Sequence, residues 1–181
     1  MAGSSRYPAG TVRAPRDAVP GQGVGMARKD GSQVGAAGEY YVAFRLSQMG
    51  YIVAMPRAGS PTVDLLVSNA AGSRTVPIQV KTAEKGIKEK GRGTAKKPHH
   101  IDFAVGPRSA KLNSEGLFFV FVDLKGKSHD SQPEVWVVPS TDLSNSCKTW
   151  VDKVAWVRWQ EDLAAVEKYR NAWHRITDQL A

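Results

Sequence analysis

The residues of this sequence whose types and spacing could do chemistry lie between Glu39 and Lys81. Glu39 falls in a helical segment, Asp64 falls in an apolar run, and Gln79-Val80-Lys81 closes a second apolar run. Because successive side chains of a strand point to opposite faces, Gln79 and Lys81 are expected on one face. Carboxylate and amide oxygens suit a divalent metal ion, and a nearby lysine suits a nucleophilic water or a developing negative charge. The stretch therefore predicts a metal site beside a cation.

Sequence patterns place these residues on a helix and on neighbouring strands. Ser32 can cap a helix that runs through Met49, and Gly50 can end it. Three strands are expected next, then a polar, Gly-broken basic loop over 84–98 that could hold one short helix, then further strands and a last helix. The expected strands are Tyr51–Met55, Val63–Ser68, Thr75–Thr82, His99–Val105, Leu117–Leu124 and Val135–Pro139, and the last helix covers Gln160–Leu180.

The net charge of +8 is concentrated in two segments. Residues 1–32 carry five Lys or Arg and two Asp, a balance of +3, and residues 81–97 carry seven Lys or Arg and two Glu, a balance of +5. The rest of the chain therefore sums to zero. A basic segment that begins at the expected site favours a polyanionic partner there. A solvated basic loop is the simpler alternative.

Composition limits the class of protein. Residues 1–31 are rich in Gly, Ala, Pro, Ser and Arg and are expected to form a disordered basic tail, with one domain over 32–181. The single cysteine, Cys147, excludes an intramolecular disulfide framework and a Cys-based zinc cluster, which fits a cytoplasmic protein. No apolar run approaches the ~18 residues of a membrane span, and no secretory signal is expected.

A family resemblance rests on three quoted segments. They are Gly38-Glu39-Tyr40-Tyr41-Val42-Ala43, Pro61-Thr62-Val63-Asp64-Leu65-Leu66-Val67 and Ile78-Gln79-Val80-Lys81-Thr82. In this order they resemble the PD-(D/E)xK nuclease superfamily, which includes restriction enzymes and Holliday-junction resolvases. The resemblance covers about residues 33–140 in outline. It implies an α/β fold with a restriction-endonuclease-like core: a central mixed sheet of about five strands, flanked by helices, in αβββαβ order.

The resemblance also implies a role for each site residue. Asp64 matches the metal-binding aspartate, Lys81 the catalytic lysine, and Glu39 a helix glutamate of resolvase-like members. Gln79 stands where Asp or Glu is usual, as in a Q-x-K version found in some intron-encoded homing endonucleases. Asp64, Gln79 and the Val80 carbonyl would hold Mg²⁺ or Mn²⁺, and Gln79 removes one negative charge, so metal affinity is expected to fall.

The leading expectation is a divalent-metal-dependent DNA endonuclease that hydrolyses phosphodiester bonds. Six cations of the basic loop would contact the DNA backbone: Lys85, Lys88, Lys90, Arg92, Lys96 and Lys97. Two alternatives remain open. The fold could bind DNA without catalysis, or it could serve as an accessory that binds a partner through the Trp-rich C-terminal region. A homodimer is possible.

Weaker candidates have simpler explanations. His99 and His100 could be metal ligands with Asp102, but neighbouring strand residues are expected to point to opposite faces, so both are interpreted as surface or phosphate-contact residues. Cys147 has no His or basic neighbour close in sequence, so a nucleophilic role is not expected. The tryptophans are interpreted as packing residues rather than as platforms for stacked bases.

Overall fold

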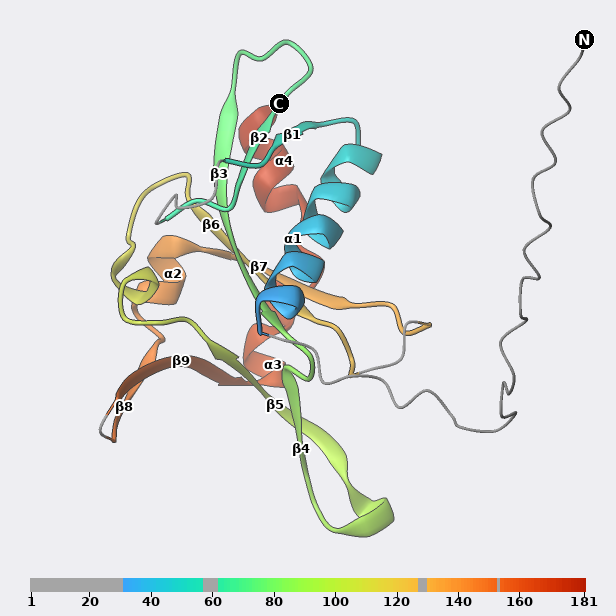
Figure 1. Ribbon diagram of the computed structural model, residues 1–181, viewed down its shortest axis with the longest axis vertical. Helices are drawn as coiled ribbons and strands as arrows, with labels where there is room; N and C mark the ends of the chain where they lie inside the picture. The colour runs from blue at the N-terminus through green and yellow to red at the C-terminus, as the bar shows by residue number, and fades with distance from the viewer. Residues whose placement is uncertain (1–30, 57–61, 127–129, 153) are drawn as a thin grey trace, which may run out of the picture.

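The computed structural model describes residues 31–56, 62–126, 130–152 and 154–181, without the side chains of 149–156 (Figure 1). The expected tail over 1–31 lies outside the described residues, apart from Gly31, which begins the first helix. The elements in chain order are α1 (Gly31–Gln48), β1 (Ile52–Ala54), β2 (Leu65–Ser68), β3 (Thr75–Ala83), β4 (Ile87–Lys90), η1 (Gly93–Ala95), β5 (Lys97–Ala104), η2 (Ser109–Lys111), β6 (Phe118–Asp123), β7 (Glu134–Pro139), α2 (Ser140–Ser144), β8 (Lys148–Asp152), β9 (Val154–Asp162), α3 (Leu163–Val166), η3 (Glu167–Tyr169) and α4 (His174–Leu180).

The centre of the molecule is a five-stranded sheet with the order β1-β2-β3-β6-β7. β3 and β6 are parallel, and the other neighbours are antiparallel. Every residue of β6 is buried, as its uninterrupted apolar run predicts for a central strand with both faces covered. The mixed sheet flanked by helices confirms the expected α/β class.

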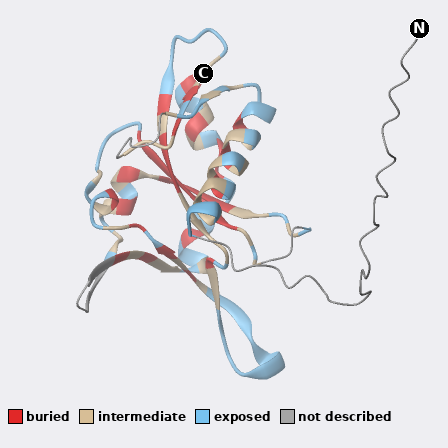
Figure 2. Cartoon of the chain, in the orientation of Figure 1, coloured by how far each residue is buried: buried red, intermediate tan, exposed pale blue. Residues whose placement is uncertain are grey.

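Two hydrophobic cores lie on the two faces of this sheet (Figure 2). On one face, Val42 and Leu46 of α1 and Ile176 of α4 pack against Ile78 and Val80. On the other face, a second sheet with the order β4-β5-β9-β8 packs its aromatic side chains on β6 and β7. The rings of Phe121 and Trp159 have centroids 4.3 Å apart there. The strand β3 is therefore held firmly from both sides.

The crossover from β3 to β6 differs from the expected αβββαβ order. It contains the hairpin β4–β5 with the short turn η1, followed by η2. β5 includes most of the expected strand His99–Val105, whereas β4 and the first residues of β5 lie where a basic loop was expected. The α-helix of that order does not occur in this crossover, all of whose residues are described. Ile101 and Phe103 alternate with less buried residues and fill the second core, so period-2 burial selects a strand. Gly91 and Gly93 have positive φ angles and form the tip of the hairpin.

The helix expected over Gln160–Leu180 is also broken in the structure. β9 continues to Asp162, and the remainder divides into α3, η3 and α4. Val157 and Trp159 are buried at alternate positions of β9, and Trp159 packs against Phe121 of the central sheet. The apolar residues do recur at helical spacing, but packing of the second sheet against the central sheet outweighs the local helical propensity.

A buried aspartate at the end of β6 fixes the base of the hairpin. The carboxylate of Asp123 is 2% exposed and accepts backbone N–H groups from Gly86 at 2.9 Å, Ile87 at 3.0 Å and Lys125 at 2.9 Å. Asp123 is not among the residues predicted from the sequence. Its only signal was a carboxylate that ends the apolar run of β6, because the partners are distant in sequence.

Replacing Asp123 with alanine is expected to destabilise the fold by about 2 kcal/mol or more, because buried backbone donors lose their acceptor. Amide exchange of Gly86 and Ile87 should accelerate, since both depend on this carboxylate. Denaturant unfolding and hydrogen exchange measure the two effects. Unchanged exchange at both amides would contradict the anchoring role.

Candidate active site

The candidate site forms where β2 stops pairing with β3. The last paired residues on this side are Leu65 and Ile78, and β3 continues to Ala83 beside β6 alone. Asp64 directly precedes β2, whereas it was expected inside the strand. Its N–H donates to the Ile78 carbonyl at 2.9 Å, and its Oδ2 accepts the Val80 N–H at 2.7 Å. The side chain of Asp64 thus replaces the missing strand and is fixed at the edge of β3.

Gln79 and Lys81 lie on the same face of β3, as the alternation predicts. Val80 between them packs into the core beneath α1, while their register partners Phe119 and Phe121 belong to the opposite core. Gln79 is only 4% exposed. Its Oε1 is buried and accepts no hydrogen bond from the residues that the structure describes. A buried amide oxygen without a donor is costly unless a ligand occupies that position.

Close packing of α1 on β3 positions Glu39. Gly38 is buried, and a Cβ atom at this position would lie 1.8 Å from Thr82 Oγ1. Only glycine allows the helix to approach the strand this closely. Glu39, the next residue, is thereby brought towards Asp64 and Lys81, although it lies on a different element. Tight helix–strand packing therefore joins the helix glutamate to the strand residues.

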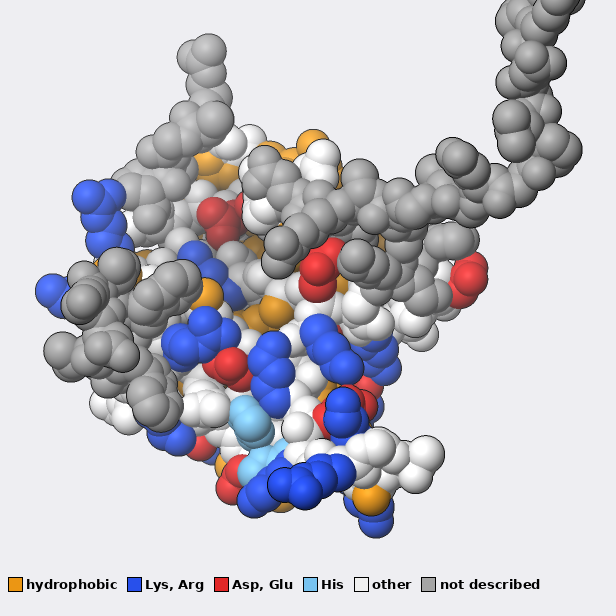
Figure 3. Space-filling view, turned by 60° about the horizontal axis from the view of Figure 1, so that its bottom comes forward, with side chains coloured by type: hydrophobic (Ala, Val, Ile, Leu, Met, Phe, Trp, Pro, Cys, Tyr) orange, Lys and Arg blue, Asp and Glu red, His pale blue; other side chains and the backbone are white. Residues whose placement is uncertain are grey.

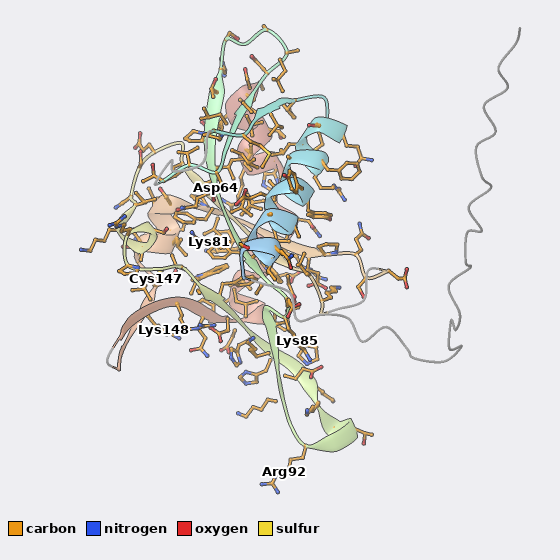
Figure 4. The ribbon with its side chains drawn as sticks, viewed as in Figure 1. Asp64, Lys81, Lys85, Arg92, Cys147 and Lys148 are labelled. Atoms are coloured by element: carbon orange, nitrogen blue, oxygen red, sulfur yellow. The ribbon has the colours of Figure 1, made fainter. Side chains whose placement is uncertain are left out.

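Electrostatics connect these three groups. Burial raises the pKa of Glu39, the Asp64 carboxylate raises it further, and Lys81 acts in the opposite direction. Burial lowers the pKa of Lys81, which Asp64 and Glu39 partly offset. Figure 4 shows Asp64 and Lys81 beside α1 near the middle of the molecule. A half-buried ammonium beside two carboxylates can bind and stabilise negative charge more strongly than one in water.

The donor set fits a hard divalent cation. Glu39 and Asp64 offer carboxylate oxygens, and the buried Gln79 Oε1 is a neutral oxygen without a donor among the described residues. A cluster of three His, Cys, Asp or Glu is absent from the described part of the chain. The amide of Gln79 thus stands in for a third carboxylate, and a set with one charge fewer is expected to bind the metal more weakly.

The six cations of the expected basic loop lie on the hairpin β4–β5 and at its base, which continues from β3. Lys85 pairs with Glu89 at 3.3 Å, and Lys88 Nζ donates to the Lys85 carbonyl at 2.6 Å. The other four are exposed and have no ion pair within the described residues: Lys90, Arg92, Lys96 and Lys97. Figure 3 shows Lys and Arg side chains gathered on this side of the molecule, with histidines beside them.

The two histidines do not diverge as expected. The register between β4 and β5 shifts, so that Lys88 pairs with His100 and Glu89 with Pro98, which leaves His99 as the extra residue of a β-bulge. A bulge disturbs the alternation of side chains. The Nδ1 atoms of His99 and His100 consequently lie 3.0 Å apart. His100 Nε2 also lies 3.0 Å from Gln160 Nε2.

Other residues behave as the sequence suggested. Burial, and then Glu161, raise the pKa of the Cys147 thiol to about 11, so it is protonated at neutral pH and is a poor nucleophile. Trp136, Trp159 and Trp173 are buried packing residues. The side chains of Trp150 and Trp156 lie outside the described set.

Replacing Lys81 with methionine is expected to leave the metal-free protein at least as stable at neutral pH. The desolvation that lowers the Lys81 pKa outweighs the attraction of Asp64 and Glu39, so the charge costs stability in the folded chain. At pH values between the lowered pKa of Lys81 in the folded chain and its ordinary value of 10.5, the unfolded chain binds more protons than the folded chain. The stability of the unaltered protein therefore rises with pH over this range. The advantage of the variant should shrink over that window.

Denaturant unfolding in EDTA at neutral and alkaline pH measures this difference. The exposed Lys111, changed to methionine, is the matched control. A Lys81→Met protein that is less stable than the unaltered one at neutral pH would contradict the burial argument.

Comparisons with known proteins support the fold. No family model matches the chain, and no curated protein matches it. Among solved structures, a bacterial homing endonuclease, I-Ssp6803I, is similar with a TM-score of 0.51 and 16% sequence identity, over 84% of this chain and 95% of that chain. The similarity shows a nuclease-like fold. None of the described helices is long and apolar enough to cross a membrane.

Proposed function

We propose that this chain is a divalent-metal-dependent DNA endonuclease of the PD-(D/E)xK type with a Q-x-K site. The observation that carries the proposal is the meeting of Asp64 and Lys81 at the free edge of β3, with Glu39 beside them and the buried oxygen of Gln79 left without a donor among the described residues. The similarity to a homing endonuclease supports the same reading.

Each residue has a distinct part in the proposed mechanism. Asp64, Gln79 Oε1 and the Val80 carbonyl would hold Mg²⁺ or Mn²⁺, with Glu39 next to them. A metal ion held there would provide Lewis-acid catalysis at the phosphate and would lower the pKa of a bound water. Lys81 would orient the attacking water and stabilise the negative charge that develops on the phosphate oxygens. Glu39, whose pKa is raised by burial, would assist by holding a metal-bound water or a second ion.

Gln79 favours one alternative, a protein with this fold that binds DNA without cutting it. A neutral amide in place of a carboxylate weakens the hold on a cation, whereas the cations of the hairpin do not depend on it. A partner-binding accessory is a further alternative, although three of the tryptophans that suggested it, Trp136, Trp159 and Trp173, are buried.

Cleavage of a mixed substrate panel tests the proposal. The purified chain would be incubated with supercoiled plasmid, linear duplex, branched junction and single strand, in Mg²⁺, Mn²⁺ or EDTA. We expect cutting with either metal and none in EDTA. DNA binding that persists in EDTA, with no cutting in any metal, would support the non-catalytic alternative instead.

A further inference from the structure

The hairpin β4–β5 forms a narrow two-stranded ribbon that projects from the body of the molecule (Figure 1). All residues from Glu89 to His99 are exposed. The tip is a tight turn in which Ala95 N–H donates to the Arg92 carbonyl at 3.1 Å. A Cβ atom on Gly91 would lie 2.5 Å from the Ala95 carbonyl oxygen, so glycine keeps the tip compact. The ribbon is thus a defined protrusion.

Its register sets like charges opposite one another. Lys90 lies directly across from Lys97. Like charges on directly opposed strand residues are destabilising. No Asp or Glu occurs from Lys90 to Ile101 to offset them. Near the body the same sheet does pair its charges, through Lys85 with Glu89 and Arg158 with Asp102. The outer part of the ribbon therefore carries basic side chains that have no acidic partner among the described residues.

Anionic groups of a partner beside each of the two lysines would offset this repulsion. Nucleic-acid phosphates supply such charge, and local violations of stable pairing are typical of functional surfaces. Proteins that hold single strands stack bases on aromatic side chains. No Phe, Tyr or Trp occurs from Lys85 to Pro98. The composition of the ribbon therefore favours contact with a regular backbone over stacking on exposed bases.

The width of the ribbon selects among grooves. Paired strands lie about 4.8 Å apart, and their side chains add to the width of a ribbon on both sides. The major groove of B-form DNA is about 12 Å wide and admits a two-stranded ribbon, whereas the minor groove is about 6 Å wide. The major groove of A-form RNA is too deep and narrow for side chains to read. The bulge at His99 adds twist, as bulges do in two-stranded pairs.

We propose that the ribbon β4–β5 enters the major groove of a B-form DNA duplex, with Lys90 and Lys97 reaching phosphates on its two sides. This proposal rests on the proposed function, since it takes the partner to be DNA, and it specifies that the partner is a duplex. The ribbon starts four residues after β3 ends, at Ile87. The groove contact would therefore set which phosphate lies near Asp64 and Lys81.

Binding in EDTA tests the proposal without any dependence on cleavage. The full chain would be titrated by fluorescence anisotropy against a DNA duplex, its single strand, an RNA duplex of the same sequence, and a DNA duplex whose cytosines carry glucosylated hydroxymethyl groups in the major groove. We expect the unmodified duplex to bind at least about tenfold more tightly than the other three. A ligand that fills the minor groove should not compete.

Charge variants locate the contact. Lys90→Ala and Lys97→Ala should each weaken duplex binding, and the double variant should lower the slope of log affinity against log salt by about 2. The control is Arg74→Ala, an exposed cation at the β2–β3 turn, at the opposite end of the molecule in Figure 1, which should bind as before. The unfolding midpoint of the double variant should not fall, because it removes a repulsive pair.

Different failures have different meanings. Equal affinity for glucosylated and unmodified duplexes, or competition by the minor-groove ligand, would overturn the groove proposal. A preference for single strands would overturn it as well. Each of these three results would leave the nuclease proposal intact if metal-dependent cleavage occurs. Metal-dependent cutting absent from every substrate, together with intact groove binding, would instead remove the nuclease proposal and keep this one.

Discussion

Replacing Asp64 with asparagine is expected to lower metal-dependent cleavage by about 10²–10³-fold or more. Asparagine retains an oxygen that can accept the Val80 N–H, so the edge of β3 keeps its geometry. The substitution removes a negative charge from a donor set that already holds a neutral amide at Gln79, and a hard cation binds more weakly to fewer charges. The variant should therefore fold normally and bind DNA in EDTA, but cut poorly.

Lys81→Met should give a loss of similar size for a different reason, because it removes the cation that is proposed to face the phosphate. The two losses should not add fully in the double variant, since the residues act on one step. Asp142→Asn is a matched control: Asp142 is an exposed carboxylate that accepts the Tyr169 hydroxyl at 2.8 Å, away from β3. Cleavage rates with plasmid under saturating Mn²⁺ measure all four proteins. Undiminished cutting by Asp64→Asn would refute the assigned site.

Replacing Gly38 with alanine is the second change with a large expected effect. Its Cβ atom would lie 1.8 Å from Thr82 Oγ1 and 2.9 Å from Thr82 Cβ, so either α1 or β3 must shift. Overpacking of this kind costs about 1–3 kcal/mol. The shift also moves Glu39 away from Asp64 and Lys81, so cleavage should fall even where the protein remains folded.

A control for Gly38→Ala lies one turn earlier on the same helix. A Cβ atom on Gly35 would meet nothing within 4 Å, so Gly35→Ala should stabilise the protein by about 1 kcal/mol through helix propensity. Adding Thr82→Ala to Gly38→Ala should recover part of the loss, because it removes the Oγ1 and Cγ2 atoms. Urea unfolding and cleavage assays compare the four proteins. Equal stability of the Gly35 and Gly38 variants would show that close packing does not position α1.

The local part of the fold was readable from sequence. Apolar periodicity and capping residues placed α1 within one residue at each end, and the three strands after it within one residue at all but one end. Alternation placed Gln79 and Lys81 on one face of β3. These features follow from interactions between residues that are near in sequence, so the sequence shows them directly.

The basic segment illustrates where sequence reasoning failed. The glycines and charges of residues 84–98 predicted a loop, yet residues 87–90 pair with the expected strand that carries Ile101 and Phe103, and the two strands form a hairpin of a second sheet. Asp123 fixes its base through donors more than 30 residues away. Such burial depends on partners that are distant in the chain, and these partners cannot be predicted from local composition.

By itself, the sequence determined the element types around the candidate site, the carboxylate, amide and lysine that form it, and the position of the excess positive charge. Only the tertiary structure decided that Asp64 would replace a missing strand beside Val80, that Gly38 would bring Glu39 to the same place, and that the charge would stand on a ribbon with Lys90 opposite Lys97. The type of each element and the periodicity of its apolar residues are set by each residue and its neighbours in the sequence. Distances between separate elements are set by packing, which requires the whole chain to fold.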